Sequence, residues 1–282
     1  MAATHARQDR VLSSTRTVAV IIIPFLVLAF SVLVPWPSDT RQLFAWQIRP
    51  SMSAMVLGSV YLGGAYFFVR AARATRWHTV AGGFLPVATF ASLMGITTIL
   101  HWNRFLHGNV AFWLWVALYF TTPFVVLAVF LRNQREYSTS TDEEPKLTSA
   151  AARAIVVAGG LSGLMATYLY LFPYRAIDIW PWHLTALTAR MLGAIFTLGL
   201  AGLGAARERR WSAARILVQV AGVMLFLILV AGVRAHREFD PANVLTWLFA
   251  AGFAATALAM LVLYARMEAR ARSSLRPGGG DA

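Results

Sequence analysis

The stretch TVAVIIIPFLVLAFSVLV, residues 17–34, holds eighteen consecutive positions without a charged side chain. An α-helix rises about 1.5 Å per residue, so this stretch would span about 27 Å, close to the ~30 Å hydrocarbon thickness of a bilayer. Arginines precede it, as they precede the apolar core of a signal peptide. The stretch is too long for such a core, and no small-residue cleavage site follows it. We therefore predict a retained first membrane-spanning helix.

Apolar stretches of the same kind recur along the 282-residue chain. Hydrophobic residues make up 58% of the sequence and charged residues 13%, about half the charged share of an average soluble domain. The stretches predict eight membrane-spanning helices, at residues 17–34, 52–69, 79–100, 110–131, 152–172, 184–205, 214–233 and 245–267. The predicted fold class is an all-α integral membrane bundle.

Basic residues are distributed unevenly between the two predicted sides of the membrane. Of the 25 lysines and arginines, 18 fall in the terminal tails and the second, fourth and sixth loops, and 7 fall in the remaining segments. Because basic loops favour the cytoplasm, we expect a multi-pass protein of a bacterial cytoplasmic membrane with both termini cytoplasmic. This distribution explains the net charge of +13 without nucleic-acid binding, for which no basic patch with interleaved aromatics is present.

Several classes of chemistry are excluded by residue content. The chain has no cysteine, which excludes disulfides, thiolate metal sites, iron–sulfur clusters and covalent c-type haem. Its only lysine, Lys146, lies in a polar loop, which excludes a retinal Schiff base inside a helix. Walker, nucleophile-elbow and dinucleotide-binding motifs are absent from the sequence. The cofactor is therefore unknown, with haem or a divalent metal left open.

Aromatic and polar residues recur in order at a nearly constant spacing. An offset of 134 residues relates Phe105, Asn109 and Trp113 to Phe239, Asn243 and Trp247, and the same offset relates Arg76-Trp77 to Arg210-Trp211. Leu57-Gly58 matches Leu192-Gly193 at an offset of 135. Trp46 matches Trp182 at an offset of 136. This pattern predicts two copies of a four-helix unit. An even number of spans in each copy makes the copies parallel, with an axis along the membrane normal.

The repeat divides the chain into five segments. We predict an N-terminal cytoplasmic tail at 1–16, the first repeat at 17–135, a flexible linker at 136–151, the second repeat at 152–270 and a disordered tail at 271–282.

Arg190 is the candidate for an outward-facing binding site. It lies about six residues inside the sixth predicted span, where an arginine is costly and tends to pair or to contact a ligand. Candidate carboxylate partners are Asp178, Glu238 and Asp240, and the alternative is an arginine that reaches outward to lipid phosphate. We expect a polar vestibule lined by Arg190, His101, His183, His236 and Trp182, with Asp178 a further ligand-binding candidate.

The histidines allow a second interpretation. His101 and His236 occupy near-equivalent repeat positions, so they are candidates for a pair that binds haem or a metal or relays protons. The alternative is that they donate hydrogen bonds to free carbonyls at helix ends. His78 is predicted at a cytoplasmic helix end and receives no functional role. Asp240 is predicted to cap the last helix, with Pro241 in its first turn.

Three stretches carry a resemblance: FAWQIRP with the following LG, WPWHLTALTARMLG, and HWNRFLHGNVAFWLW. With these the chain resembles a group of uncharacterised bacterial polytopic, eight-span membrane proteins. The resemblance implies the topology and no activity. Three functions stay open: a small-solute carrier or binding subunit, a haem- or metal-binding redox subunit, and a non-catalytic subunit among membrane-protein partners. The lipid bilayer is the one partner that the composition predicts directly.

Overall fold

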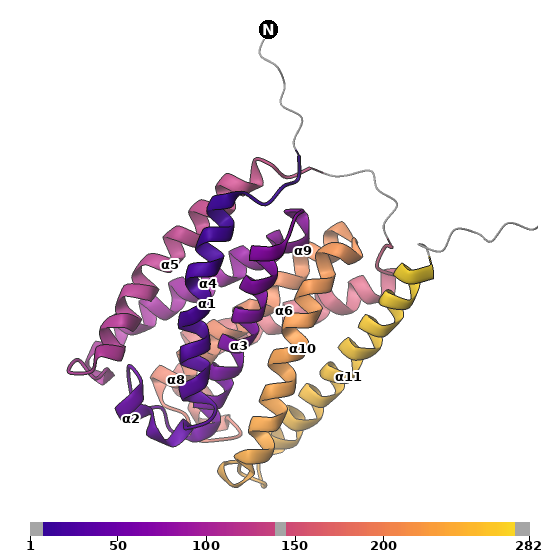
Figure 1. The fold of residues 1–282 in the computed structure, drawn as a ribbon. Coiled ribbons are helices and arrows are strands. Elements are labelled where there is room, and N and C mark those ends of the chain that lie inside the picture. Colours follow the sequence, from indigo (N-terminus) through magenta and orange to yellow (C-terminus); the bar gives the residue numbers. More distant parts are fainter. Residues whose placement is uncertain (1–7, 139–144, 274–282) are drawn as a thin grey trace, which may run out of the picture.

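The computed structural model describes residues 8–138 and 145–273 (Figure 1). Within them the regular structure is helical, and extended backbone is limited to isolated bridging pairs. Eight of these helical segments are long and apolar enough to cross a membrane, one for each predicted span. The prediction of an all-α membrane bundle is confirmed.

The first four spans begin and end within a few residues of their predicted bounds. They are α1 (Ser13–Leu33), α3 (Ser51–Arg73), α4 (His78–Leu100) and α5 (Val110–Gln134). Short helical turns η1 (Pro37–Asp39), α2 (Thr40–Leu43) and η2 (Trp102–Arg104) connect them. The start of α5 is fixed by Asn109, whose side-chain oxygen accepts a hydrogen bond from the backbone N–H of Ala111.

The last four spans include one that changes its helical form. They are α6 (Ser149–Leu171), the sixth span Ala186–Glu208, α10 (Trp211–Arg234) and α11 (Val244–Ser273). The sixth span is α8 (Ala186–Phe196), the 3₁₀ segment η3 (Thr197–Leu200) and α9 (Ala201–Glu208) in succession. Short helices α7 (Pro173–Ile179) and η4 (His236–Glu238) lie in the connections.

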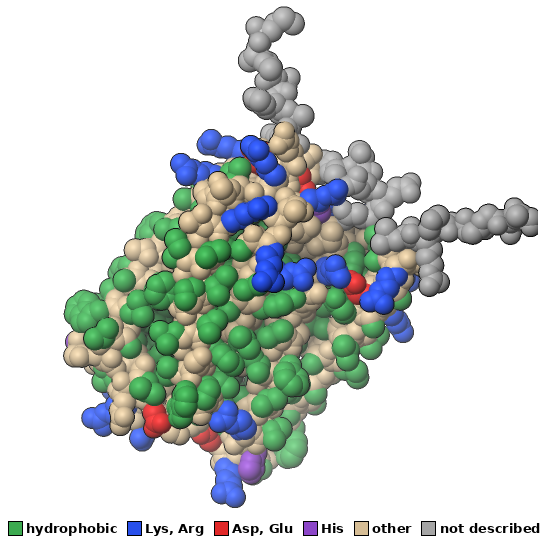
Figure 2. Space-filling view, viewed as in Figure 1, with side chains coloured by type: hydrophobic (Ala, Val, Ile, Leu, Met, Phe, Trp, Pro, Cys, Tyr) green, Lys and Arg blue, Asp and Glu red, His purple; other side chains and the backbone are tan. Residues whose placement is uncertain are grey.

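The two ends of the bundle differ in charge. We call the end that holds the start of α1 and the end of α11 the terminal end, and the end that holds α2, α7 and η4 the loop end (Figure 1). Arginines and lysines gather at the terminal end and a smaller group lies at the loop end, with hydrophobic side chains between them (Figure 2). An apolar band between two charged ends matches the surface of a protein that spans a bilayer.

Helices α3 and α4 lie at the centre of the bundle. Helix α3 packs against α1 and α10, while α4 packs against α5, α8 and α10. In the most apolar 18-residue stretch of α3, 78% of the residues are buried, whereas none is buried in the corresponding stretch of α11. Small residues allow the close approach: a Cβ at Gly58 would lie 2.6 Å from Val34, and one at Gly193 would lie 2.9 Å from the carbonyl of Ala166 on α6.

The loop end contains matched contacts in the two predicted repeats. The side-chain amide of Asn109 donates to the Phe44 carbonyl (3.1 Å), and that of Asn243 donates to the Trp180 carbonyl (3.3 Å). The rings of Trp46 and Phe105 lie 5.2 Å apart, and so do those of Trp182 and Phe239. The duplication stays a prediction, and these contacts support it.

The terminal end shows the same correspondence. The indole of Trp77 donates to Gln134 (3.1 Å), and that of Trp211 donates to Glu268 (3.0 Å). The backbone bridges at this end pair Arg10 with Arg76 and Lys146 with Arg210. The predicted segments 1–16, 136–151 and 271–282 thus have described parts that pack on the bundle, while 1–7, 139–144 and 274–282 lie outside the described residues.

One predicted helix cap is wrong. Asp240 accepts from the backbone N–H of Ala242, but α11 begins only at Val244, so Pro241 precedes the helix. Asn243 takes the capping role, because its side-chain oxygen accepts from the Leu245 backbone N–H at 2.9 Å. Asn243 therefore caps α11 in the same way as Asn109 caps α5, and Asp240 does not cap α11.

Candidate functional site

Arg190 contacts a histidine rather than a carboxylate. From α8 its guanidinium reaches the end of α4, where Nη1 lies 2.6 Å from Nε2 of His101. Both side chains are half-buried. The contact lies between spans of different predicted repeats, and it unites two of the residues that sequence analysis placed in one vestibule.

The electrostatics of this pair favour a neutral imidazole. Burial lowers the pKa of His101 from its ordinary value, and the positive charges of Arg190 and Arg104 lower it further. A neutral ring presents a lone pair at Nε2, which accepts the hydrogen bond that the guanidinium donates. The arrangement therefore keeps the positive charge on the arginines.

The acids proposed as partners of Arg190 have other surroundings. Glu238 accepts from the backbone N–H groups of Ser51 (2.9 Å) and Met52 (2.7 Å) at the start of α3. Asp178 is exposed, and Asp240 is held by its own turn. Because a carboxylate is stabilised at a helix N-terminus, Glu238 serves as an anchor between the halves.

The other predicted vestibule residues do not gather around Arg190. Trp182 is buried, and its indole donates to Ser53 at 2.9 Å, which links the two halves. His183 is exposed and lines a separate recess of about 400 Å³ together with Arg49 and Glu238. Arg190, Trp182 and His183 of the predicted vestibule therefore have different surroundings: the contact with His101, the contact with Ser53 and the recess beside Glu238.

His101 and His236 have different partners. His236 is exposed, and its Nδ1 lies 3.1 Å from the Val233 carbonyl of the helix that it follows. Within the described residues, no three histidine, aspartate or glutamate side chains form a group that could hold a metal ion. Metal or haem binding by His101 and His236 stays a prediction from sequence.

A buried polar cluster at the terminal end was missed by sequence analysis. Nδ1 of His78 contacts a carboxylate oxygen of Asp9, and Nε2 lies 3.1 Å from the hydroxyl of Ser212. Asp9 also accepts from the backbone N–H of His78 at 3.0 Å. The signal available in the sequence was the repeat offset, since His78 and Ser212 directly follow the matched Arg-Trp pairs.

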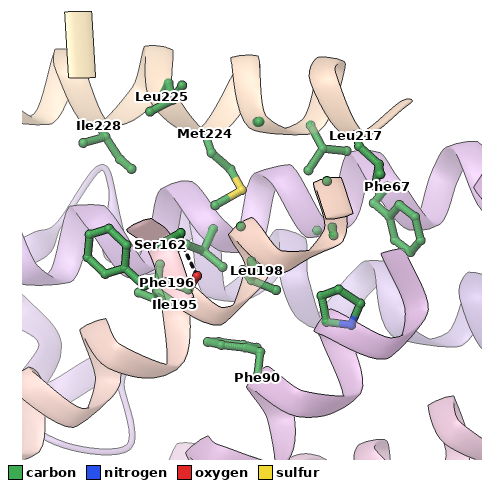
Figure 3. Close-up of a pocket in the computed structure, with 18 of the residues that line it drawn as sticks. Phe67, Phe90, Ser162, Ile195, Phe196, Leu198, Leu217, Met224, Leu225 and Ile228 are labelled. Atoms are coloured by element: carbon green, nitrogen blue, oxygen red, sulfur yellow. Dashed lines mark hydrogen bonds between the residues drawn. The ribbon is translucent and has the colours of Figure 1, made fainter. Parts of the chain in front are cut away.

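A large, partly open cavity lies between the membrane-spanning helices. It has a volume of about 1420 Å³ and is lined mainly by apolar side chains of both halves; we call it the intramembrane cavity. Met224 of α10 lies beside Gly63 of α3, and Phe90 of α4 and Phe67 of α3 also line the cavity (Figure 3). An apolar cavity of this kind binds apolar groups in preference to water.

The 3₁₀ segment of the sixth span forms part of this wall. The change from α to 3₁₀ geometry at Thr197 leaves backbone carbonyls without their usual partners. The hydroxyl of Ser162 donates to the Phe196 carbonyl at 2.6 Å (Figure 3), and that of Thr197 donates to the Ala194 carbonyl at 2.6 Å. These bonds stabilise the irregular backbone in an apolar environment.

The intramembrane cavity has a different extent in the two halves. On α11 its lining runs from Leu245 to Arg270, nearly the whole length of the helix. On α5 the lining ends at Thr122. Beyond that point α1 and α5 are joined by the hydrogen bond from Thr15 to Asn133 (2.7 Å). The cavity lining is therefore longer on α11 than on α5.

These features define a class: a polytopic α-helical membrane protein with a partly open apolar cavity between its helices. No family model, curated protein or solved structure matches this chain.

Proposed function

We propose that this polytopic membrane protein binds, and as a carrier moves, a lipid-like molecule that occupies the intramembrane cavity. The observation that carries the proposal is the cavity itself, about 1420 Å³ and lined mainly by apolar side chains of both halves. A small polar solute would lose its hydration there without gaining hydrogen bonds. An apolar or amphipathic ligand loses no such bonds and gains contact with the walls.

This proposal replaces the small solute that the sequence predicts with a lipid-like molecule. The polar groups at the loop end are divided between the Arg190–His101 pair and the recess of about 400 Å³ beside His183. The intramembrane cavity is larger and is built by residues of both halves. We therefore assign the binding role to it rather than to an outward polar vestibule.

A second candidate is docking of a partner subunit. The most apolar window of α11 has no buried residue, and large side chains such as Leu258 and Leu261 are more than 60% exposed. An exposed apolar helix of this kind also suits a partner membrane helix. The two candidates differ in what accompanies the purified protein, lipid or a second polypeptide.

The test uses a pair of substitutions on one helix. Ala259 lines the cavity, whereas Leu261 does not and lies on a different face of α11, two residues or about 200° away. We expect Ala259→Trp to lose most of the lipid that co-purifies with the wild type in mild detergent, and Leu261→Trp to retain it. Lipid is quantified by extraction and mass spectrometry. Equal retention by both variants, or no lipid above that of detergent-washed controls, would refute the proposal.

A further inference from the structure

Two arginines lie at the terminal end of the intramembrane cavity. Arg266 and Arg270 both line it, and their spacing of four residues places them on one face of α11. Both side chains are exposed. Among the residues that the structure describes, neither guanidinium has a hydrogen bond or an ion pair. The apolar cavity therefore ends in two positive charges that no described carboxylate neutralises.

The nearest acid on the same helix is already engaged. Glu268 accepts from the indole of Trp211 (3.0 Å) and from Nη2 of Arg215 (2.8 Å) on α10. Its position between the two arginines in sequence places it on a different face of α11. It holds α11 against α10 and leaves the cavity face with a net positive charge.

The first half provides an internal comparison. At the predicted offset of 134 residues, Arg266 and Arg270 correspond to Arg132 and Glu136. Glu136 forms an ion pair with Arg10 (3.6 Å), and the cavity lining on α5 ends well before it, at Thr122. The long cavity lining and the two unneutralised arginines thus occur together on α11, and neither occurs at the matching place on α5.

The depth of the arginines fits a lipid headgroup. From Leu245 at the loop end, Arg266 and Arg270 lie 21 and 25 residues along α11, or about 32 and 37 Å. A hydrocarbon core about 30 Å thick therefore covers the apolar lining and leaves both guanidinium groups at headgroup level. Guanidinium groups bind phosphate through paired, charge-assisted hydrogen bonds.

We propose that Arg266 and Arg270 bind the phosphate of an anionic phospholipid whose acyl chains lie in the intramembrane cavity. This inference rests on the proposed function and adds the headgroup class. The occupant is a lipid of the leaflet at the terminal end. A neutral lipid fills the cavity equally well but adds no net negative charge, so the arginines select anionic headgroups.

The experiment measures lipid binding by native mass spectrometry of the full chain in mixed micelles. Phosphatidylglycerol and phosphatidylcholine are titrated separately. Because each arginine near an anionic surface contributes attraction, we expect the wild type to bind phosphatidylglycerol about 30-fold more tightly than phosphatidylcholine. In Arg266→Gln/Arg270→Gln the preference falls to about threefold or less, because phosphatidylglycerol binding weakens far more than phosphatidylcholine binding. The matched control Arg132→Gln keeps the preference.

Further arms separate the outcomes. The charge-conserving Arg266→Lys/Arg270→Lys variant retains most of the preference, which shows that the site tolerates substitution. Retention of the full preference by the double glutamine variant overturns the inference. Displacement of phosphatidylglycerol by inorganic phosphate at similar concentration also overturns it, because the site would then bind a free anion. If the wild type binds both lipids equally and Ala259→Trp binds neither, the headgroup inference fails while the proposed function stands.

Discussion

The imidazole of His78 and the hydroxyl of Ser212 lie 3.1 Å apart, although 134 residues separate them in sequence. This separation equals the offset between the predicted repeats. Two residues at equivalent positions of related halves meet only near the axis that relates the halves. The contact therefore supports a predicted axis that passes between the first turns of α4 and α10, at the terminal end.

Removal of the His78 ring tests this junction. In His78→Ala the buried carboxylate of Asp9, 6% exposed, loses its contact with the ring, and we expect a loss of about 3 kcal/mol in stability. Ser212→Ala removes the hydroxyl that contacts Nε2 of His78, and we expect it to cost about 1 kcal/mol. Both effects are measured as thermal unfolding in detergent. We expect the larger loss of stability in His78→Ala. An equal loss of stability in Ser212→Ala would contradict this expectation.

The lowered pKa of His101 predicts a pH dependence of stability. Its pKa in the folded protein lies below the ordinary value of 6.5, so the unfolded chain binds more protons in the window between the two values. The contribution of His101 is therefore fully present above about pH 6.5, and it is lost as pH falls below that value. His101→Gln should weaken the decline in the unfolding temperature between pH 7.5 and 5.5.

A His183→Gln variant is measured alongside, as the control for replacing an exposed histidine by glutamine. Arg190→Gln should raise the pKa of His101, because it removes one of the charges that lower it. A pH profile that is unchanged in His101→Gln would contradict the assignment.

Substitution of two glycines tests the packing of matched helix pairs. Alanine at Gly58 would bring its Cβ to 2.6 Å from Val34, and alanine at Gly193 would lie 2.9 Å from the Ala166 carbonyl and the Tyr170 amide. We expect each to cost about 1–3 kcal/mol, with the larger loss at Gly193, where backbone atoms block the new group. At Gly252 an added Cβ would have no described atom within 4 Å apart from its own turn of α11, so Gly252→Ala should be neutral or stabilise by up to about 1 kcal/mol.

The orientation in the membrane is tested by reporter fusions. The 18 basic residues on one predicted side and 7 on the other predict that both termini lie in the cytoplasm. A reporter joined after Ser273 should be active as a cytoplasmic fusion, and one inserted next to Asn103 in η2 should be active on the opposite side. Five of the eight spans lie between Asn103 and Ser273, so the two reporters should lie on opposite sides of the membrane. Reporters on the same side would contradict the eight-span topology.

Local properties of the sequence were sufficient for the class and the number of spans. Hydropathy over about 20 residues decides whether a helix can cross a bilayer, and this sum needs no knowledge of neighbours. The matched Phe, Asn and Trp positions also indicated equivalent turns before α5 and α11, where Asn109 and Asn243 make equivalent hydrogen bonds. The cap was misassigned to Asp240 because several capping residues lie within one short turn.

The partners of the polar side chains were decided by the tertiary structure. Arg190 pairs with His101 because α8 packs against the end of α4, a contact between residues 89 positions apart. The intramembrane cavity, whose lining is longer on α11 than on α5, likewise depends on the distances between whole helices. Helix separations depend on how side chains of neighbouring helices fill the space between them, and this packing is decided only when the helices have come together.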